Sequence, residues 1–182
     1  MYRISVAFLF LASIPLMSSA AEKAFPQTEV GHFEIKTLPA ARLIASQTDR
    51  AYFEDGNGLF RPLFRYISSR DIAMTTPVEA EIAPGVMYFY IGSDVNQETL
   101  DSTENVTVHE LPERIVASHG VRGSYSERNF KEAATALRDW LASNKTYEAA
   151  GEPRGIFWNG PFVPGFFKRF EVHIPLRLIE AE

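Results

Sequence analysis

The chain has 182 residues, carries a formal net charge of −5 and contains no cysteine. The absence of cysteine excludes disulfides, cysteine-ligated metal sites, cofactors attached through thioethers and a lipid-anchored lipoprotein. The acidic balance argues against binding to a nucleic-acid backbone, because that interaction requires a basic face.

The N-terminus has the three-part layout of a secretory signal peptide. Arg3 is followed by an apolar run at 4–17 and by four small residues at 18–21. The apolar run is shorter than the roughly 20 residues that a membrane span needs, which favours a cleaved signal over a membrane anchor. We therefore predict a signal peptide at 1–21, export to the periplasm or out of the cell, and one domain at 22–182 without membrane insertion.

The chain after the signal begins with a lead-in and two strands. Residues 21–29 read as a disordered or loosely docked lead-in. Apolar and polar residues then alternate at 32–36, which predicts a strand with one wet face. Pro39 separates this strand from a second predicted strand at 41–48.

A turn, a short helix and a hairpin follow. The Asp-Gly-Asn-Gly cluster at 55–58 predicts a turn. From Leu59 onward, apolar residues recur at helical spacing, and Pro62 is expected in the first turn, where its missing N–H matters least. Strands at 79–82 and 86–91, joined by a Pro-Gly turn, predict a hairpin.

The second half of the chain repeats this plan. Ser126, with Asn129 three residues later, predicts the start of a helix that ends at Asn144. A loop at 159–167 carries three phenylalanines beside glycine and proline, and such rings usually either tuck under a domain or line a site. The other predicted strands lie at 106–110, 114–121, 154–158 and 170–178.

Two stretches of the chain nearly repeat each other. The segment LPAARLIASQTDR at 38–50 returns as LPERIVASHGVR at 111–122, with the same spacing from the first arginine to the last. We therefore predict an α+β fold built from two pseudo-repeated strand-helix-strand halves that share one sheet and one core. Such halves leave a groove near their pseudo-twofold axis where a ligand could sit.

Three runs of sequence carry a resemblance to a known family. They are FRPLFRYI at 60–67, IAMTTPV at 72–78 and FKRFEVHIPL at 167–176. With these motifs the chain resembles the SOUL haem-binding proteins over essentially all of residues 22–182. The resemblance implies a distorted β-barrel with two flanking helices, similar in architecture to the effector-binding domains of certain bacterial transcription regulators.

The resemblance also implies where a tetrapyrrole would bind. Some family members hold haem through a histidine just after the first strand, but here FEIK at 33–36 is followed by Thr37, so that axial ligand is missing. Other members use an apolar groove between the first helix and the loop before the last strand. The matching positions here are Phe64 and Arg65 on the helix and Pro164 and Phe166 on the loop.

The residue types on the first helix fit this chemistry. Arg61 and Arg65 are four residues apart and share one helix face, beside Phe60 and Phe64. A porphyrin ring favours burial, and its two propionates favour guanidinium partners. The alternative is that both arginines are solvated surface charges.

The histidines offer few ligand sites. His119 lies on the inward face of its strand and is either a hydrogen-bonded core residue or a ligand of haem iron. His32 and His173 alternate with apolar neighbours and are expected to face water. No pair of histidines has zinc-site spacing, so we expect no metal site made of protein ligands alone.

Little in the sequence indicates catalysis. Ser118 and His119 are adjacent in a strand and point to opposite faces, which removes an obvious nucleophile and base pair. Glu79 and Glu81 share a strand face and are expected on its wet side. A buried glutamate with a raised pKa would instead favour an effector-type module, or a derived hydrolase, for small amphipathic or cationic molecules.

The sequence therefore predicts an exported carrier or scavenger rather than an enzyme. Its cofactor or cargo would be haem or a related tetrapyrrole, held without a covalent bond in the apolar groove. Its partners would be this or another small hydrophobic ligand, and not nucleic acid. A groove that holds a peptide or a partner protein is a third hypothesis.

Overall fold

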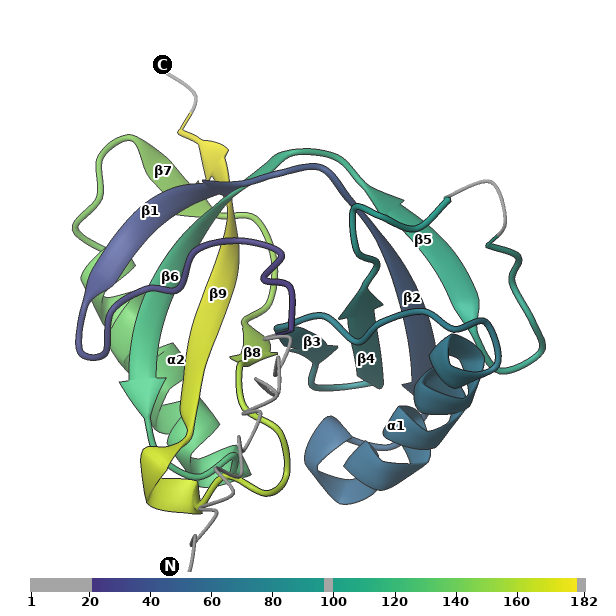
Figure 1. Ribbon diagram of the computed structural model, residues 1–182. Coiled ribbons are helices and arrows are strands. Elements are labelled where there is room, and N and C mark those ends of the chain that lie inside the picture. Colours follow the sequence, from purple (N-terminus) through teal and green to yellow (C-terminus); the bar gives the residue numbers. More distant parts are fainter. Residues whose placement is uncertain (1–20, 97–99, 180–182) are drawn as a thin grey trace, which may run out of the picture.

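The computed structural model describes residues 21–96 and 100–179 (Figure 1). All of the predicted signal peptide except its last residue lies outside the described residues. The helices are α1 (Tyr52–Ser68), α2 (Glu127–Leu141) and the short 3-10 helix η2 (Gly165–Phe167). The strands are β1 (Phe33–Leu38), β2 (Ala41–Thr48), β3 (Val78–Glu81), β4 (Gly85–Tyr90), β5 (Thr107–Leu111), β6 (Arg114–Arg122), β7 (Tyr147–Ala149), β8 (Arg154–Phe157) and β9 (Arg169–Leu178).

The strands form one curled antiparallel sheet. Their order is β1-β6-β9-β8-β3-β4-β2-β5, and β7 pairs with the last residues of β9. The twist of neighbouring strands curls this sheet into a half-barrel (Figure 1). Within the described chain β1 and β5 remain its edges, so the distorted β-barrel implied by the family resemblance is an open half-barrel. The α+β class with two helices is confirmed.

Both α-helices cover the same face of the sheet. α2 packs on β6 and β9, and α1 packs on β2 and β4. Each helix buries an apolar stripe at helical spacing, and its central leucine, Leu137 in α2 and Leu63 in α1, is 0% exposed. We call this side of the sheet the helix face.

The start of α2 follows its local sequence signal. The Ser126 side chain accepts a hydrogen bond from the backbone N–H of Asn129 at 3.2 Å, which satisfies one of the free donors at the helix N-terminus. The predicted N-cap is confirmed, and the helix ends at Leu141, slightly before the predicted Asn144.

α1 is longer than predicted. It begins at Tyr52, and the predicted turn at 55–58 lies inside it, with a kink at Asp55 (φ −136°, ψ 27°). The Tyr52 ring stacks on Phe157 of β8 with centroids 5.4 Å apart, and this burial outweighs the weak helix propensity of the two glycines in the turn. Pro62 therefore lies inside the helix and not in its first turn.

The opposite face of the sheet is covered at its centre by residues 22–30, which we call the N-terminal strap (purple in Figure 1). Phe25 is only 4% exposed, and its ring makes edge contacts with Tyr90 and Trp158 at 5.6 and 5.4 Å. The prediction of a loose lead-in at 21–29 is wrong, because burying this ring docks the segment. On this face, the helix-free face, the Phe25 ring of the strap packs at the centre of the sheet, in one cluster with Tyr90 of β4 and Ile156 of β8.

Candidate functional site

The exposed side of α1 carries a pair of aromatic rings. Phe60 and Phe64 stack with centroids 5.6 Å apart and an interplanar angle of 16°. Phe60 is anchored by an edge contact with Phe89 of β4 at 5.5 Å, whereas Phe64 is 48% exposed. The helix therefore presents an apolar surface of two rings to solvent.

Arg61 and Arg65 flank this ring pair. Both side chains are exposed, and neither forms an ion pair with a carboxylate of the described residues. Arg50, just before the helix, instead pairs with Glu54 at 3.6 Å. Because the guanidinium groups of Arg61 and Arg65 are not engaged by a carboxylate, they keep their capacity for bidentate contacts with an anionic ligand.

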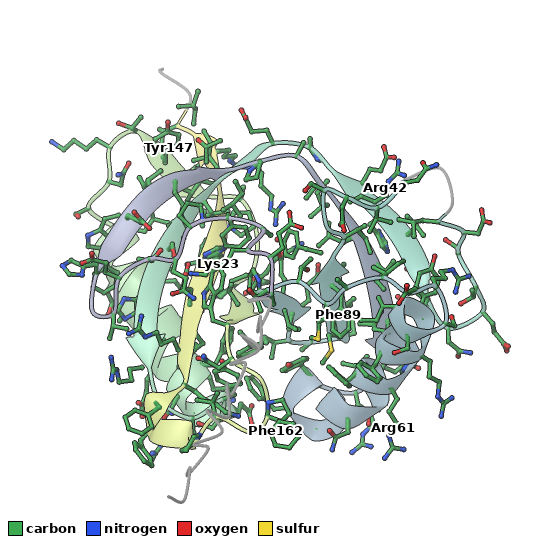
Figure 2. All side chains as sticks on the ribbon, viewed as in Figure 1. Lys23, Arg42, Arg61, Phe89, Tyr147 and Phe162 are labelled. Atoms are coloured by element: carbon green, nitrogen blue, oxygen red, sulfur yellow. The ribbon has the colours of Figure 1, made fainter. Side chains whose placement is uncertain are left out.

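The loop before β9 reaches the same end of the molecule. Pro164 is exposed and Phe166 is 68% exposed, just ahead of β9. Figure 2 shows Phe162 of this loop and Arg61 of α1 at one edge. Two surface hollows of the described chain, of about 430 and about 360 Å³, include no residue of the loop, although Leu59 and Pro62 of α1 line the second. The helix and loop residues thus share an end of the molecule, and neither of these two hollows is lined by both.

His119 makes its contacts with β1. Its ring stacks on Phe33 with centroids 4.0 Å apart and an interplanar angle of 5°, and its Nδ1 lies 3.1 Å from the carbonyl oxygen of His32. Phe33 in turn stacks on Trp140 of α2. These contacts give His119 a packing role on the helix face, and a role as a haem ligand stays a prediction.

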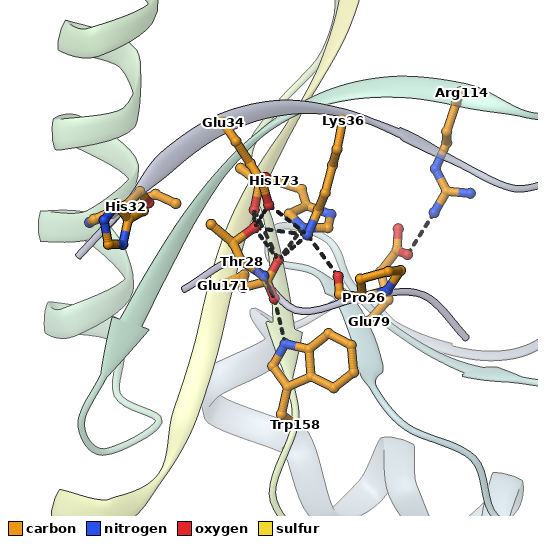
Figure 3. A network of polar contacts seen from close by, with 12 residues as sticks. Pro26, Thr28, His32, Glu34, Lys36, Glu79, Arg114, Trp158, Glu171 and His173 are labelled. Carbon is orange, nitrogen blue, oxygen red and sulfur yellow. Dashed lines mark hydrogen bonds and ion pairs between the residues drawn. The ribbon is translucent and has the colours of Figure 1, made fainter. Parts of the chain in front are cut away.

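Two buried carboxylates lie at the centre of the helix-free face (Figure 3). Glu79 of β3 and Glu171 of β9 are each 1% exposed. Both are registered opposite Ile156 of β8, so they point to the same side of the sheet. The prediction that Glu79 lies on a wet strand face is wrong, because the helix-free face is covered too.

Glu79 is held by two arginines and a tyrosine. Arg114 Nη2 donates to Oε2 at 2.9 Å, Arg154 Nη1 donates to Oε1 at 2.8 Å, and the Tyr90 hydroxyl also donates to Oε2. Burial alone would raise the pKa of Glu79, but the two guanidinium groups and the Tyr90 hydrogen bond outweigh it and hold the pKa below its ordinary value. The carboxylate is therefore ionised and already neutralised from within the chain.

Glu171 is held by groups from the strap and the sheet. Lys36 Nζ and His173 Nε2 each donate to Oε2 at 2.8 Å. The backbone N–H of Thr28 and the indole N–H of Trp158 donate to Oε1 at 2.9 and 2.8 Å. Burial works to raise the pKa of Glu171, but His173 and Lys36 outweigh it and lower the pKa to about 2.

The prediction that His173 faces water is wrong. Its side chain is 2% exposed, and burial holds its pKa below the ordinary value, so the neutral ring donates from Nε2 to Glu171. His32, predicted in the same way, does face water, with its side chain 68% exposed. Alternation marks the two faces of a strand, but it does not say whether a distant segment covers the polar one.

The members of this network that sequence reasoning missed come from four separate parts of the chain. Thr28 belongs to the strap, Lys36 to β1, Arg114 to β6, and Arg154 and Trp158 to β8 and its end. The one available signal was Phe25, a large apolar residue in a lead-in that otherwise looks unstructured. Such a ring often marks a docked segment.

No group of three or more histidine, aspartate or glutamate side chains placed to hold a metal ion occurs within residues 21–96 and 100–179. In the same part of the chain, no helix is both long and apolar enough to cross a membrane. The chemistry described above therefore consists of aromatic surfaces, guanidinium groups and internally paired carboxylates.

Solved structures with a similar fold include a regulator domain and a hydrolase. The C-terminal domain of EcmrR matches with a TM-score of 0.64 and 15% identity, over 81% of this chain and 98% of the domain. In the EcmrR–DNA complex the match covers 58% of the longer EcmrR chain. A hydrolase from Listeria innocua matches with a TM-score of 0.57 and 10% identity, over 82% of this chain and 94% of that one. These low identities show a shared fold alone, and no curated protein matches in sequence.

A family comparison extends beyond the fold. The sequence pattern described as "SOUL heme-binding protein" matches residues 22–175. This range runs from the strap through both helices and the loop before β9 into most of that strand. The resemblance seen in the motifs at 60–67 and 72–78 is therefore confirmed, and the chain belongs to the SOUL heme-binding protein family.

Proposed function

We propose that the protein is an exported carrier that binds haem or a related tetrapyrrole reversibly at the exposed side of α1. The observation that carries the proposal is the stacked pair of Phe60 and Phe64, flanked by Arg61 and Arg65, which are not ion-paired to any described carboxylate. Membership of a heme-binding family supports a tetrapyrrole as the ligand class.

The residues fit the two chemical parts of such a ligand. The macrocycle would lie against the ring pair of α1, with Pro164 and Phe166 contributing from the loop. The propionates would accept hydrogen bonds from Arg61 and Arg65, which are separated by one helical turn. Binding would then bury the exposed ring of Phe64 and pair two arginines that have no carboxylate partner among the described residues.

Recognition in this proposal depends on the macrocycle more than on iron. Thr37 stands where some family members have the axial histidine, and it is exposed at the end of β1. The His119 ring is engaged by Phe33. We therefore expect modest affinity and little difference between haemin and iron-free protoporphyrin.

An effector-type module for cationic molecules is the runner-up. It needs a buried carboxylate that is free to meet a cation, and the two EcmrR matches support it through fold alone. Glu79 is buried, but it is paired with Arg114 and Arg154, and its pKa is lowered where the hypothesis requires it to be raised. A cationic ligand is therefore kept as an outcome of the test.

The test is a titration of residues 22–182 with haemin, with iron-free protoporphyrin and a cationic amphiphile run in parallel. Saturable Soret shifts with similar affinities for both porphyrins are expected. A response to haemin alone would move recognition from the ring pair to an iron ligand such as His119. No response to either porphyrin would remove the proposed function, and binding of the amphiphile alone would put the effector-type function in its place.

Export and duplication are further parts of the proposal. Export is supported by the signal-like layout of residues 1–21, and N-terminal sequencing of the protein from expressing cells should begin near residue 22. An origin from two copies is supported by the spacing shared by 42–50 and 114–122 and by the two-strand, one-helix succession that begins each half.

A further inference from the structure

Three phenylalanines on the loop before β9 are exposed to an unusual degree. Phe162 is 98% exposed, Phe166 68% and Phe167 57%. Phe166 and Phe167 touch each other with centroids 4.4 Å apart. None of the three rings lines either of the two surface hollows of about 430 and about 360 Å³. Large apolar side chains that protrude together from one loop mark an interaction surface.

Basic residues without described carboxylate partners lie next to this loop. Arg122 at the end of β6 lies opposite Arg169 at the start of β9, and Lys168 precedes Arg169. None of the three is ion-paired to a carboxylate that the structure describes, and Lys168 lies over the Tyr125 ring at 4.7 Å. Elsewhere on the surface, cations pair readily with acids, as Lys131–Glu127, Arg138–Glu152 and Arg177–Glu148 do.

The chain as a whole is acidic, with a formal net charge of −5, so this end of the molecule differs in sign from the average surface. Arg61, labelled near the same edge as Phe162 in Figure 2, extends the basic character to α1. An anionic partner would therefore be attracted to this end and repelled by the rest of the protein. The net charge of the whole chain is negative and would repel an anionic partner, so the attraction depends on the local basic residues.

The shape of the loop favours a flat partner over a chain that needs a groove. Its backbone is closed on itself, since Val163, Phe167 and Lys168 donate to the carbonyls of Gly160, Pro164 and Gly165. Those N–H groups need no other partner when the loop meets an apolar medium. The three rings are exposed to solvent, so they can enter the headgroup region of a bilayer while the cations meet its anionic lipids.

We propose that the loop 159–168, together with Arg122 and Arg169, is a docking surface for an anionic lipid bilayer. The protein would lie on the membrane with Phe162, Phe166 and Phe167 in the interface, and it would not cross it. The proposal does not depend on tetrapyrrole binding, because most of its residues are not among those proposed to hold the macrocycle.

The test is co-sedimentation of residues 22–182 with vesicles in the absence of any porphyrin. Vesicles of phosphatidylcholine with phosphatidylglycerol should bind the protein, and vesicles of phosphatidylcholine alone should bind it far more weakly. Added salt should weaken the binding. Failure to bind the anionic vesicles, or equal binding to both kinds, would overturn the proposal.

Two sets of variants separate the rings from the charges. Phe162→Ser with Phe167→Ser, and Arg122→Gln with Arg169→Gln, should each lower the vesicle partition coefficient by about tenfold or more. Lys131→Gln with Arg138→Gln makes the same charge change on α2 and should have little effect. An equal loss in this control would overturn the proposal, because binding would then follow total charge.

The ring variant also distinguishes this proposal from the tetrapyrrole proposal. Phe162 and Phe167 are exposed, so their replacement should leave the urea unfolding midpoint and the haemin titration unchanged. Loss of vesicle binding with unchanged haemin binding is the expected result. Retention of full vesicle binding by this variant would overturn the docking surface and leave the tetrapyrrole proposal intact.

Discussion

Charged and aromatic side chains are buried at the centre of the helix-free face, whereas they are exposed at the end of the molecule formed by α1 and η2. At the centre, Glu79 and Glu171 are buried and paired with cations of the same chain, and the ring of Phe25 is enclosed. At the end, Phe162 is 98% exposed and Arg61 has no described carboxylate partner. Both regions combine aromatic residues with charges. At the centre the charges are paired within the chain, and at the end they have no described carboxylate partner.

This difference in burial and pairing indicates which region stabilises the fold and which is available for binding. A buried charge that is fully paired contributes to holding segments together, because the removal of either partner leaves the other uncompensated. An exposed cation beside exposed rings contributes little to folding and remains available to an external ligand. We therefore assign a structural role to the centre and binding roles to the end, although the centre looks more like an active site.

The largest effect is expected from Glu171→Gln, which tests the structural role of the buried centre. The amide cannot neutralise Lys36 or accept from all the donors that meet the carboxylate, so the free energy of unfolding should fall by about 3–5 kcal/mol, measured by urea denaturation. The control is Glu148→Gln, which removes an exposed partner of Arg177 and should cost less than about 1 kcal/mol. Equal losses in the two variants would deny the centre its structural role.

The next largest effect is expected from a pair of phenylalanine substitutions, one at the buried centre and one at the exposed end. Phe25→Ala should lower the free energy of unfolding by about 3 kcal/mol, because it removes a buried ring and leaves a cavity beside Trp158. Phe162→Ala makes the same chemical change on an exposed ring and should alter stability by less than about 0.5 kcal/mol. Similar unfolding midpoints for both variants would show that the strap is not part of the folded core.

The pH dependence of stability should report the same centre. The pKa of Glu171 is about 2 in the folded chain against an ordinary value of 4.5, so the unfolded chain takes up this proton at a higher pH. The stabilisation, up to about 3 kcal/mol, is complete above pH 4.5 and is lost as the pH falls toward 2. The lowered pKa of the buried His173 adds a loss in the same direction that begins below pH 6.5.

Urea midpoints measured across this pH range in the wild type and in Glu171→Gln provide the check. The variant lacks the titrating carboxyl group, so its stability should fall less steeply between pH 4.5 and 2. Parallel curves for the two proteins would assign the acid sensitivity to other groups.

The smallest expected effect concerns the open end. Replacing Arg61 and Arg65 together with Ala should weaken haemin binding by about 1–3 kcal/mol if they hold the propionates, as measured by Soret titration. The matched control is Arg128→Ala with Lys131→Ala on α2, where both residues already pair with acids. Unchanged haemin affinity in the first variant would discard the proposed role of the two arginines.

Two predictions based on local signals were confirmed, and a third was wrong. The strand at 41–48 agrees with β2 at both ends, and the Ser126 cap begins α2. The turn predicted at 55–58 failed because Tyr52 packs on Phe157, a residue far along the chain. Such a contact overrides local propensity, and its partner cannot be identified from the turn sequence itself.

By itself, the sequence determined the α+β class, most strands, the family and the grouping of Phe60, Phe64, Arg61 and Arg65 on one helix, because these follow from spacing within short segments. Only the tertiary structure decided that Glu79, Glu171 and His173 are buried. Their burial depends on the strap and on cations from other strands. The alternation of apolar and polar residues within a strand does not indicate which distant segment will cover its polar face.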